Sequence, residues 1–349
     1  MLENAPGVGK TGDAERRWPA RLGVNIVIDR ARFGALVLAI GLLASPAFAQ
    51  VYPTRPITDI VASTPGGGTD IISRIVGEQL AKQLGQPFVV ENIPGAGSLS
   101  GTVAAAKAAP DGYTLTTGLI ASMAVNPSLF AHLPYDPIRD FEPIAMLAKF
   151  PFAVVVSKNF PARSIQELIA LAKAKPGEIN FASAGAGTGQ HLSMEQFELI
   201  TGIKLTHVPY RGAQPAYADV ISGQVPVFFD NLASALGQIQ GGNVRALAVT
   251  GTQRSPLLPD VPTVGESGVP DYQYYVWFGF WAPKKTPQPI IEKLHDEVEK
   301  ALATPIVQQR IAAAAGEPFN MPLAEITPFV QSEIAKWADV VKRAGVTVQ

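Results

Sequence analysis

The chain has 349 residues, of which 28 are Lys or Arg and 29 are Asp or Glu, so its net charge at pH 7 is −1. This near-neutral balance offers no basic surface to nucleic acid, and we expect no nucleic-acid partner. The sequence contains no Cys, which excludes a disulfide framework, a lipid-modified Cys and a zinc site built on thiolates.

A secretory leader is expected first. Arg30 and Arg32 precede an apolar run at residues 33–43, which is followed by Ala47-Phe48-Ala49. A basic segment, a short apolar segment and a small-residue cleavage motif in that order are typical of a signal peptide. We therefore expect export to the periplasm with cleavage after Ala49, and residues 1–29 suggest a misplaced start site. No later segment is apolar for long enough to span a membrane.

The roughly 300 residues after the leader are too many for one ordinary core and fit two lobes of about 150 residues each. Short β-branched runs alternate with longer helical patterns, which is typical of βαβ units. The sequence therefore predicts an α/β fold with two lobes, each a mainly parallel sheet flanked by helices. We assign residues 50–151 and 276–349 to lobe 1 and residues 152–275 to lobe 2.

Lobe 1 begins with a strand and an amphipathic helix. Its strands are expected at residues 57–62, 88–91 and 113–117, and its first helices at 70–84 and 103–107. One face of the helix at 70–84 carries apolar residues at helical spacing, namely Ile71, Ile72, Ile75, Val76 and Leu80. Gly85 is placed to end this helix.

Lobe 2 repeats the pattern. Its strands are expected at 152–157, 179–182, 205–208, 225–229 and 244–250, and its helices at 164–174, 190–200, 215–221 and 232–239. The aromatic stretch at 272–281 alternates too densely to be assigned. The helices expected at 287–302 and 323–344 have no strands of their own, so we expect them to pack on lobe 1, with crossings near Pro151 and Val276 that act as a hinge.

Two strand-to-helix turns, one in each lobe, are rich in glycine. The first reads Ser63-Thr64-Pro65-Gly66-Gly67-Gly68-Thr69-Asp70, and the second reads Ser183-Ala184-Gly185-Ala186-Gly187-Thr188-Gly189-Gln190-His191. Glycine lets a ligand approach the main chain, so that backbone N–H groups at a helix start can reach an anion. One such turn is equally typical of a plain flexible connection, but two at strand ends are expected to face each other across a cleft. Because neither contains Lys or Arg, the expected ligand is a carboxylate held by neutral donors with roughly micromolar affinity.

Motifs for nucleotides, metals and catalysis are weak. The segment at 95–100 has Ser where the third glycine of a dinucleotide fingerprint belongs, and the segment at 7–11 lacks the first glycine of a P-loop. The four His residues show no zinc-ligand spacing, so we expect no cofactor and no metal. Ser183 and His191 leave a second hypothesis open, an exported enzyme acting on a carboxylate, although no Gly-x-Ser-x-Gly motif surrounds Ser183.

Two polar segments at strand ends of lobe 2 complete the candidate site. Arg211 is expected to pair with a second ligand carboxylate, and Asp230 to select a ligand amine or an ordered water; a solvated or structural salt bridge is an equal alternative for each. The residues expected to bind the ligand are Gly67, Gly68, Thr69, Asp70, Ser122, Ser183, Ala184, Gly185, Thr188, Gly189, His191, Tyr210, Arg211 and Asp230.

Six short motifs, in order along most of the mature chain, are similar to those of one family. They are Tyr52-Pro53-x-Arg55-Pro56-Ile57, Pro65-Gly66-Gly67-Gly68-Thr69-Asp70, Asn92-x-Pro94-Gly95-Ala96-Gly97, Pro110-Asp111-Gly112-Tyr113-Thr114-Leu115, Leu133-Pro134-Tyr135-Asp136-Pro137 and His207-Val208-Pro209-Tyr210-Arg211-Gly212. On these motifs the chain resembles the Bug (TctC-like) family, the periplasmic receptors of tripartite tricarboxylate transporters. Ser98-Leu99-Ser100 departs from the Gly-x-Ile usual there.

The resemblance implies a two-lobed periplasmic binding protein, a type II-like Venus flytrap, that clamps a ligand carboxylate between the two glycine turns without catalysis. It implies delivery of a small carboxylate solute to integral membrane transporter subunits, and we expect a monomer. Family ligands range over citrate, dicarboxylates, amino acids and aromatic acids, so the resemblance does not name the solute. A receptor that serves a sensor kinase is the remaining alternative.

Overall fold

The structure is a computed structural model that describes residues 52–346; residues 1–51 and 347–349 lie outside the described part. The expected signal peptide and its cleavage after Ala49 fall outside it. No helix among the described residues combines the length and the apolar character that a membrane crossing requires. Residues from Tyr52 on form one compact unit, so the division into two lobes stays a prediction.

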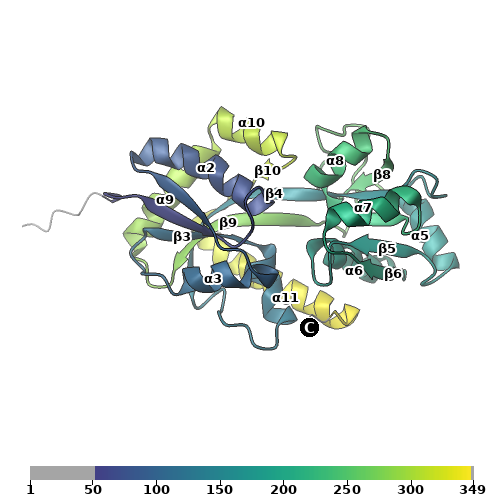
Figure 1. Ribbon diagram of the computed structural model, residues 1–349, viewed down its shortest axis with the longest axis horizontal. Helices are drawn as coiled ribbons and strands as arrows, with labels where there is room; N and C mark the ends of the chain where they lie inside the picture. The colour runs from purple at the N-terminus through teal and green to yellow at the C-terminus, as the bar shows by residue number, and fades with distance from the viewer. Residues whose placement is uncertain (1–51, 347–349) are drawn as a thin grey trace, which may run out of the picture. The chain divides into compact units, whose positions relative to one another are not determined.

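Within residues 52–346, ten strands form one sheet, which runs through the molecule (Figure 1). They are β1 Ile57–Val61, β2 Phe88–Asn92, β3 Thr114–Leu119, β4 Phe141–Ser157, β5 Asn180–Ser183, β6 Thr206–Pro209, β7 Val227–Asn231, β8 Val244–Val249, β9 Tyr275–Pro283 and β10 Glu317–Pro318. The order of neighbours is β2-β1-β3-β9-β4-β7-β5-β6, and β8 and β10 also pair with β4. We call β1, β2, β3, β9, β10 and residues 141–151 of β4 the first half-sheet, and β5 to β8 with residues 152–157 of β4 the second half-sheet.

In each half-sheet, the carboxyl ends of the parallel strands point toward the other half-sheet. β1 and β3 are parallel, and β9 is antiparallel both to β3 and to β4, so β1, β3 and β4 run the same way. β4 continues from the first half-sheet into the second, where β7 is antiparallel to it and β5 and β6 follow the direction of β7. The carboxyl ends of β1 and β3 therefore point toward the second half-sheet, and those of β5, β6 and β7 point back toward the first.

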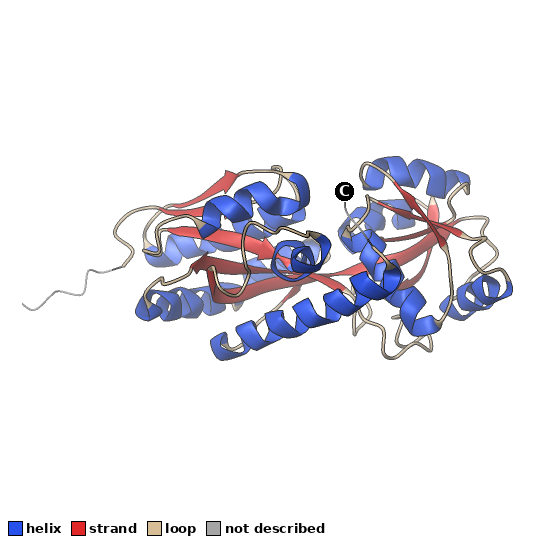
Figure 2. Ribbon diagram, turned by 90° about the horizontal axis from the view of Figure 1, so that it is seen from below, coloured by secondary structure: helices blue, strands red, loops and turns tan. Residues whose placement is uncertain are grey.

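Helices cover both faces of the sheet (Figures 1 and 2). They are α2 Gly68–Leu84, α3 Leu99–Ala106, α4 Asn126–Leu129, α5 Ile165–Ala174, α6 Gly189–Thr201, α7 Ala213–Ser222, α8 Leu232–Gln240, α9 Gln288–Leu302, α10 Pro305–Ala313 and α11 Leu323–Ala344, with a 3₁₀ turn η1 at Ala96–Ser98 and a π-helical turn η2 at Ala121–Val125. In the first half, α2, α9 and α10 share one apolar core, and α3 and α11 contribute to another.

Helix α2 follows its sequence signals closely. Ile72, Val76 and Leu80 are fully buried, whereas Ile71, expected on the same face, is 40% exposed. The helix ends at Gly85, whose φ of 66° is the left-handed conformation that glycine adopts without strain. At its other end, α2 begins at Gly68, so its first turn lies directly after the glycine-rich turn that follows β1.

The pairing is more mixed than expected, because two long strands were not recognised. The parallel pairs of β1 with β2 and β3, and of β5 with β6 and β7, agree with the βαβ pattern. β9 and residues 141–151 of β4, however, pair antiparallel to each other. Both are buried over nearly their whole length. A strand covered on both faces lacks the apolar–polar alternation by which strands are read from sequence.

Helix α11 links the two halves. It packs against η2 and α4 of the first half, and also against α6, which follows β5 of the second half. The sequence predicts that both terminal helices pack on lobe 1. In the structure α9 packs against α2 and β4, and α11 packs on the first half and, in addition, on α6. Trp337 on α11 is fully buried and stacks edge-on against Tyr274 at 5.6 Å between ring centroids, beside the start of β9.

Candidate functional site

The turn after β1 presents three backbone N–H groups without a protein acceptor. Within the described residues, the N–H groups of Gly66 and Gly67 donate to Asp70 Oδ2 and to the Thr64 carbonyl. Those of Gly68, Thr69 and Asp70 form the first turn of α2, where no preceding helical carbonyl is within reach. They carry the positive end of the helix dipole, and together they form a candidate site for an anion.

Asp70 fixes this turn rather than facing outward. Its carboxylate accepts hydrogen bonds from Gly66 N, Asn92 Nδ2 and Arg74 Nε at 2.9 to 3.0 Å. Burial acts to raise the pKa of Asp70, but the hydrogen bonds from Arg74, Gly66 and Asn92 outweigh it and hold the pKa at about 2. The expected ligand contact of Asp70 is thus limited to its main chain, since the carboxylate is occupied.

The turn after β5 has the same design with different partners. Gly185 N donates to Ser183 Oγ at 3.1 Å, and Gly187 N donates to His191 Nδ1 at 3.1 Å. Thr188 contributes its N–H and its hydroxyl to the Gly185 carbonyl. Among the described residues, the N–H groups left without a protein acceptor here are those of Ala184, Ala186, Gly189, Gln190 and His191.

A stacked pair of histidines is hydrogen-bonded to the second turn. The rings of His191 and His207 are parallel within 9° and 3.7 Å apart between centroids, and His207 Nε2 lies 2.6 Å from Ser183 Oγ. Burial, followed by the neighbouring His191, lowers the pKa of His207 to about 4, so it is neutral at pH 7. Because His191 Nδ1 accepts from Gly187, a ring proton lies on Nε2, 3.3 Å from Glu195 Oε1.

The geometry does not support catalysis by Ser183 and His191. The hydroxyl of Ser183 bonds to His207 and to Gly185, not to His191, and Ser183 is fully buried. Among the described residues, no carboxylate is hydrogen-bonded to His207 to orient it as a base. This geometry speaks against the alternative hypothesis of a Ser183/His191 enzyme, and Ser183 instead shapes the turn.

Asp230 lies behind the second turn, which corrects its expected role. It is fully buried, and its two carboxylate oxygens accept hydrogen bonds from Gln190 Nε2 and Tyr217 OH. Burial raises the pKa of Asp230 to about 6 against the opposing effect of these hydrogen bonds. Its hydrogen bond positions Gln190 in the first turn of α6, and its full burial separates it from a ligand amine.

Of the remaining residues expected to bind the ligand, Ser122 and Tyr210 are hydrogen-bonded within the protein, and Arg211 is exposed. Ser122 is fully buried and bonds to the main chain of Leu119. Tyr210 donates its hydroxyl to Asp219 at 2.6 Å, so this hydroxyl is engaged within the protein. Arg211, just past the end of β6, is exposed, and the described residues provide its guanidinium with no hydrogen-bonded partner.

Sequence reasoning missed three supporting residues. His207, Asn92 and Gln190 hold the two turns in place, yet none has a motif of its own. His207 and Asn92 lie in the motifs that carried the family resemblance, and this was the only signal for them. Their partners lie on other strands or helices, at separations that no local spacing rule covers.

Gly189 is required by the protein's own packing. A Cβ placed there would lie 2.6 Å from the Tyr274 hydroxyl and 3.2 Å from Phe152 Cζ. We expect Gly189→Ala to lower the free energy of unfolding by about 1–3 kcal/mol, as overpacking does, measured by urea denaturation. Tyr274→Phe removes the nearest atom and should restore part of the loss in the double variant. Equal stability of wild type and Gly189→Ala would contradict this packing.

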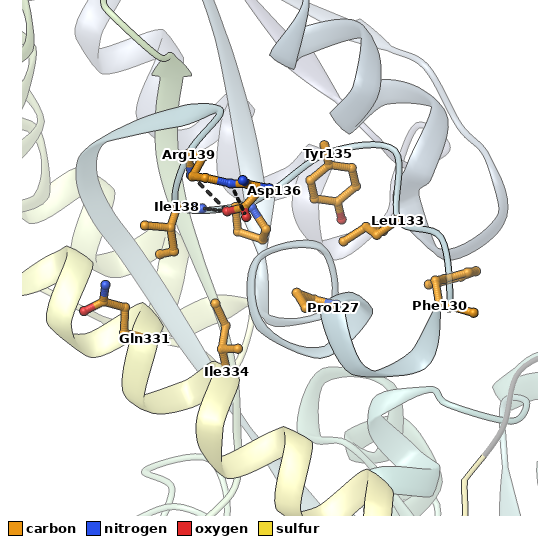
Figure 3. A pocket seen from close by; sticks show the side chains of 11 residues that line it. Pro127, Phe130, Leu133, Tyr135, Asp136, Ile138, Arg139, Gln331 and Ile334 are labelled. Carbon is orange, nitrogen blue, oxygen red and sulfur yellow. Dashed lines mark hydrogen bonds and ion pairs between the residues drawn. The ribbon is translucent and has the colours of Figure 1, made fainter.

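The cavities identified in the structure include a large one away from both turns. It has a volume of about 580 Å³ and lies between residues 127–139 and α11, with Tyr135, Arg139 and Ile334 among its lining residues (Figure 3). Tyr135 donates its hydroxyl to the Ser122 carbonyl. Among the described residues there is no cluster of His, Asp and Glu suited to a metal.

Comparison with known proteins gives the family. The family described as the tripartite tricarboxylate transporter family receptor, TctC, matches residues 72–346, which is more than half of the chain. The chain belongs to the TctC family. Its curated relatives include Protein BugT of Bordetella pertussis, 38% identical over 323 residues that cover 92% of this chain and 99% of BugT.

Solved TctC-like structures share the fold. The chain is similar to Rpa4515 of R. palustris with adipate, at 34% identity and a TM-score of 0.74, covering 85% of this chain and 100% of that one. It is similar to MatC of Rhodopseudomonas palustris with bound malate, at 33% identity and a TM-score of 0.70, covering 83% and 100%. These matches confirm the α/β periplasmic binding protein fold, and this TctC protein is a solute-binding receptor, not an enzyme.

Proposed function

We propose that this TctC protein captures a small carboxylate solute in the periplasm between its two glycine turns and delivers it to integral membrane subunits of a tripartite transporter. The observation that carries the proposal is the set of free N–H groups in the first turns of α2 and α6. Both sets follow strands whose carboxyl ends point toward the opposite half-sheet. In open α/β sheets ligands bind at such ends.

The solute class that fits best is a dicarboxylate. Neither turn holds a cationic side chain, so one carboxylate is held by main-chain donors. Arg211, exposed at the end of β6 beside β5, offers a second, bidentate donor for another carboxylate. The relatives solved with adipate and malate carry ligands of this class.

Export and assembly follow the same proposal. The leader at residues 30–49 directs secretion, and cleavage after Ala49 releases a freely diffusing monomer. The first half-sheet and its helices, including α9 to α11, form lobe 1, and the second half-sheet forms lobe 2. The hinge lies where β4 exchanges its neighbour β9 for β7 and β8.

A thermal-shift comparison of three matched solutes tests this function. Ligand binding to the native state adds RT ln(1 + [L]/Kd) to stability, about 2.7 kcal/mol at 100 times Kd, so Tm should rise by several degrees. We expect adipate to stabilise the mature protein more than hexanoate, which lacks the second carboxylate, and adipamide to have no effect. Malate, citrate and glutamate extend the series.

Two outcomes of the thermal-shift series would contradict the proposal in whole or in part. If none of the carboxylates shifts Tm while uncharged solutes do, the turns do not form an anion site. If hexanoate and adipate act equally, the carboxylate site stands and the assignment of Arg211 to a second carboxylate fails.

A further inference from the structure

A second cavity lies beside the two long strands. It has a volume of about 300 Å³ and is lined by β4, by the start of β9, by the segment after β10 and by α11. This volume is at the lower end of the range for small-molecule sites. None of its lining residues belongs to either glycine turn, so a ligand here would be separate from the solute of the proposed function.

The walls of this cavity are aromatic. Phe329 packs edge-on against Trp277 at 5.4 Å and against Phe319 at 5.5 Å between ring centroids, and Tyr275 and Met321 also line the space. Trp277 is only 2% exposed. Aromatic faces arranged in this way accept a flat apolar group by stacked or edge-on contacts.

The polar groups of the cavity favour an anion. Glu333 is occupied: its Oε2 accepts both Trp277 Nε1 and Trp337 Nε1. Lys149 and Lys336, in contrast, contact carboxylates only at 3.5 Å and 3.3 Å, longer than the 2.7–2.9 Å of a strong charge-assisted bond. Each ammonium has three donors, so both retain capacity for a ligand carboxylate.

The cavity lies near the point where β4 passes from the first half-sheet to the second, so movement between the half-sheets would change its shape. Lys149 pairs with Trp277 and Pro151 pairs with Tyr275, and the second of these β4–β9 pairs is the last before β4 takes β7 and β8 as neighbours. The opposite wall is α11, which packs against elements of both halves. A molecule wedged between these strands and α11 contacts the same elements that connect the two glycine turns.

We propose that this cavity is a second binding site for an aromatic monocarboxylate, and that its occupancy is coupled to solute binding at the glycine turns. The ring packs against Phe329, Phe319 and Tyr275, and the carboxylate is held by Lys336 and Lys149. Coupling is reciprocal: the factor by which the aromatic acid changes the solute affinity equals the factor by which the solute changes the affinity for the aromatic acid.

Benzoate titration of the full mature protein tests the site, with Trp fluorescence and calorimetry as readouts. Lys336→Met should weaken benzoate binding about tenfold, because a charge-assisted hydrogen bond is lost. Lys342→Met, an exposed lysine of the same helix, is the matched control and should leave it unchanged. Gly68→Val, in the first glycine turn, should still bind benzoate.

Three results would overturn the proposal. Non-saturable benzoate binding would remove the site. Loss of binding in Gly68→Val with full binding in Lys336→Met would place benzoate at the glycine turns instead. For the coupling, we expect saturating benzoate to change the Kd of adipate in wild type but not in Lys336→Met; an unchanged Kd in wild type would remove the coupling.

Discussion

Gly68→Val is expected to abolish most solute binding while leaving the fold intact. Gly68 is the first residue of α2, and a Cβ there would meet only Phe278 Cζ at an ordinary 3.5 Å. Side chains of a helix lean toward its N-terminus, so the two methyl groups of Val cover the N–H groups that the carboxylate needs. We expect a loss of about 100-fold in affinity, or about 2.7 kcal/mol, measured by calorimetry with the most stabilising carboxylate of the thermal-shift series.

The matched control is Gly237→Val, the same change on α8, where a Cβ meets nothing within 4 Å. The free energy of unfolding of both variants should lie within about 1 kcal/mol of that of wild type, but only Gly68→Val should lose solute binding. Gly68→Ala, with a single methyl group, should retain most affinity. Full affinity in Gly68→Val would remove the first turn from the site.

Asp70→Ala is expected to weaken both the fold and the site. Asp70 is 3% exposed and holds Gly66, Arg74 and Asn92 together. Removing one partner of a buried, hydrogen-bonded ion pair typically costs about 3–5 kcal/mol, and we expect about 3 because Arg74 is half exposed and regains water. With the turn released, solute affinity should fall at least about tenfold. Urea denaturation and calorimetry measure the two effects.

The pH dependence identifies the carboxylate as the cause. The pKa of Asp70 is about 2 in the folded protein and about 3.9 when unfolded. Its stabilising contribution is therefore complete above about pH 5 and disappears as the pH falls toward 2. Asp70→Asn should be less stable than wild type at pH 7, and the difference should shrink with acidification. A difference that is constant with pH would contradict the assignment.

The helices were read well from sequence because their patterns are local. The helix expected at 323–344 matches α11 residue for residue, and Gly85 ends α2 as expected. β9 was missed because its aromatic run is buried on both faces, which removes the alternation that marks a strand. The packing of α11 on α6 depends on contacts between elements far apart in the chain, which periodicity does not contain.

The site divides in the same way. The glycine turns were found because a strand, a glycine run and a helix follow one another directly in sequence. The roles of Asp70 and Asp230 were not, since a carboxylate at a strand or helix end looks the same whether it faces a ligand or a buried partner. Burial distinguishes the two cases: Asp230 is fully buried, and each of its carboxylate oxygens accepts a hydrogen bond from the protein. In the same way, only the structure shows that His207 rather than His191 is hydrogen-bonded to Ser183.

The most direct test of the account is the response of individual backbone amides to the bound carboxylate, followed by ¹H–¹⁵N NMR during titration. We expect large downfield shifts of the amide protons of Gly68 and Thr69 in one turn and of Gly189 and Gln190 in the other, at the same solute concentration. Shifts confined to one turn, or to residues remote from both, would show that the two turns do not hold the carboxylate together.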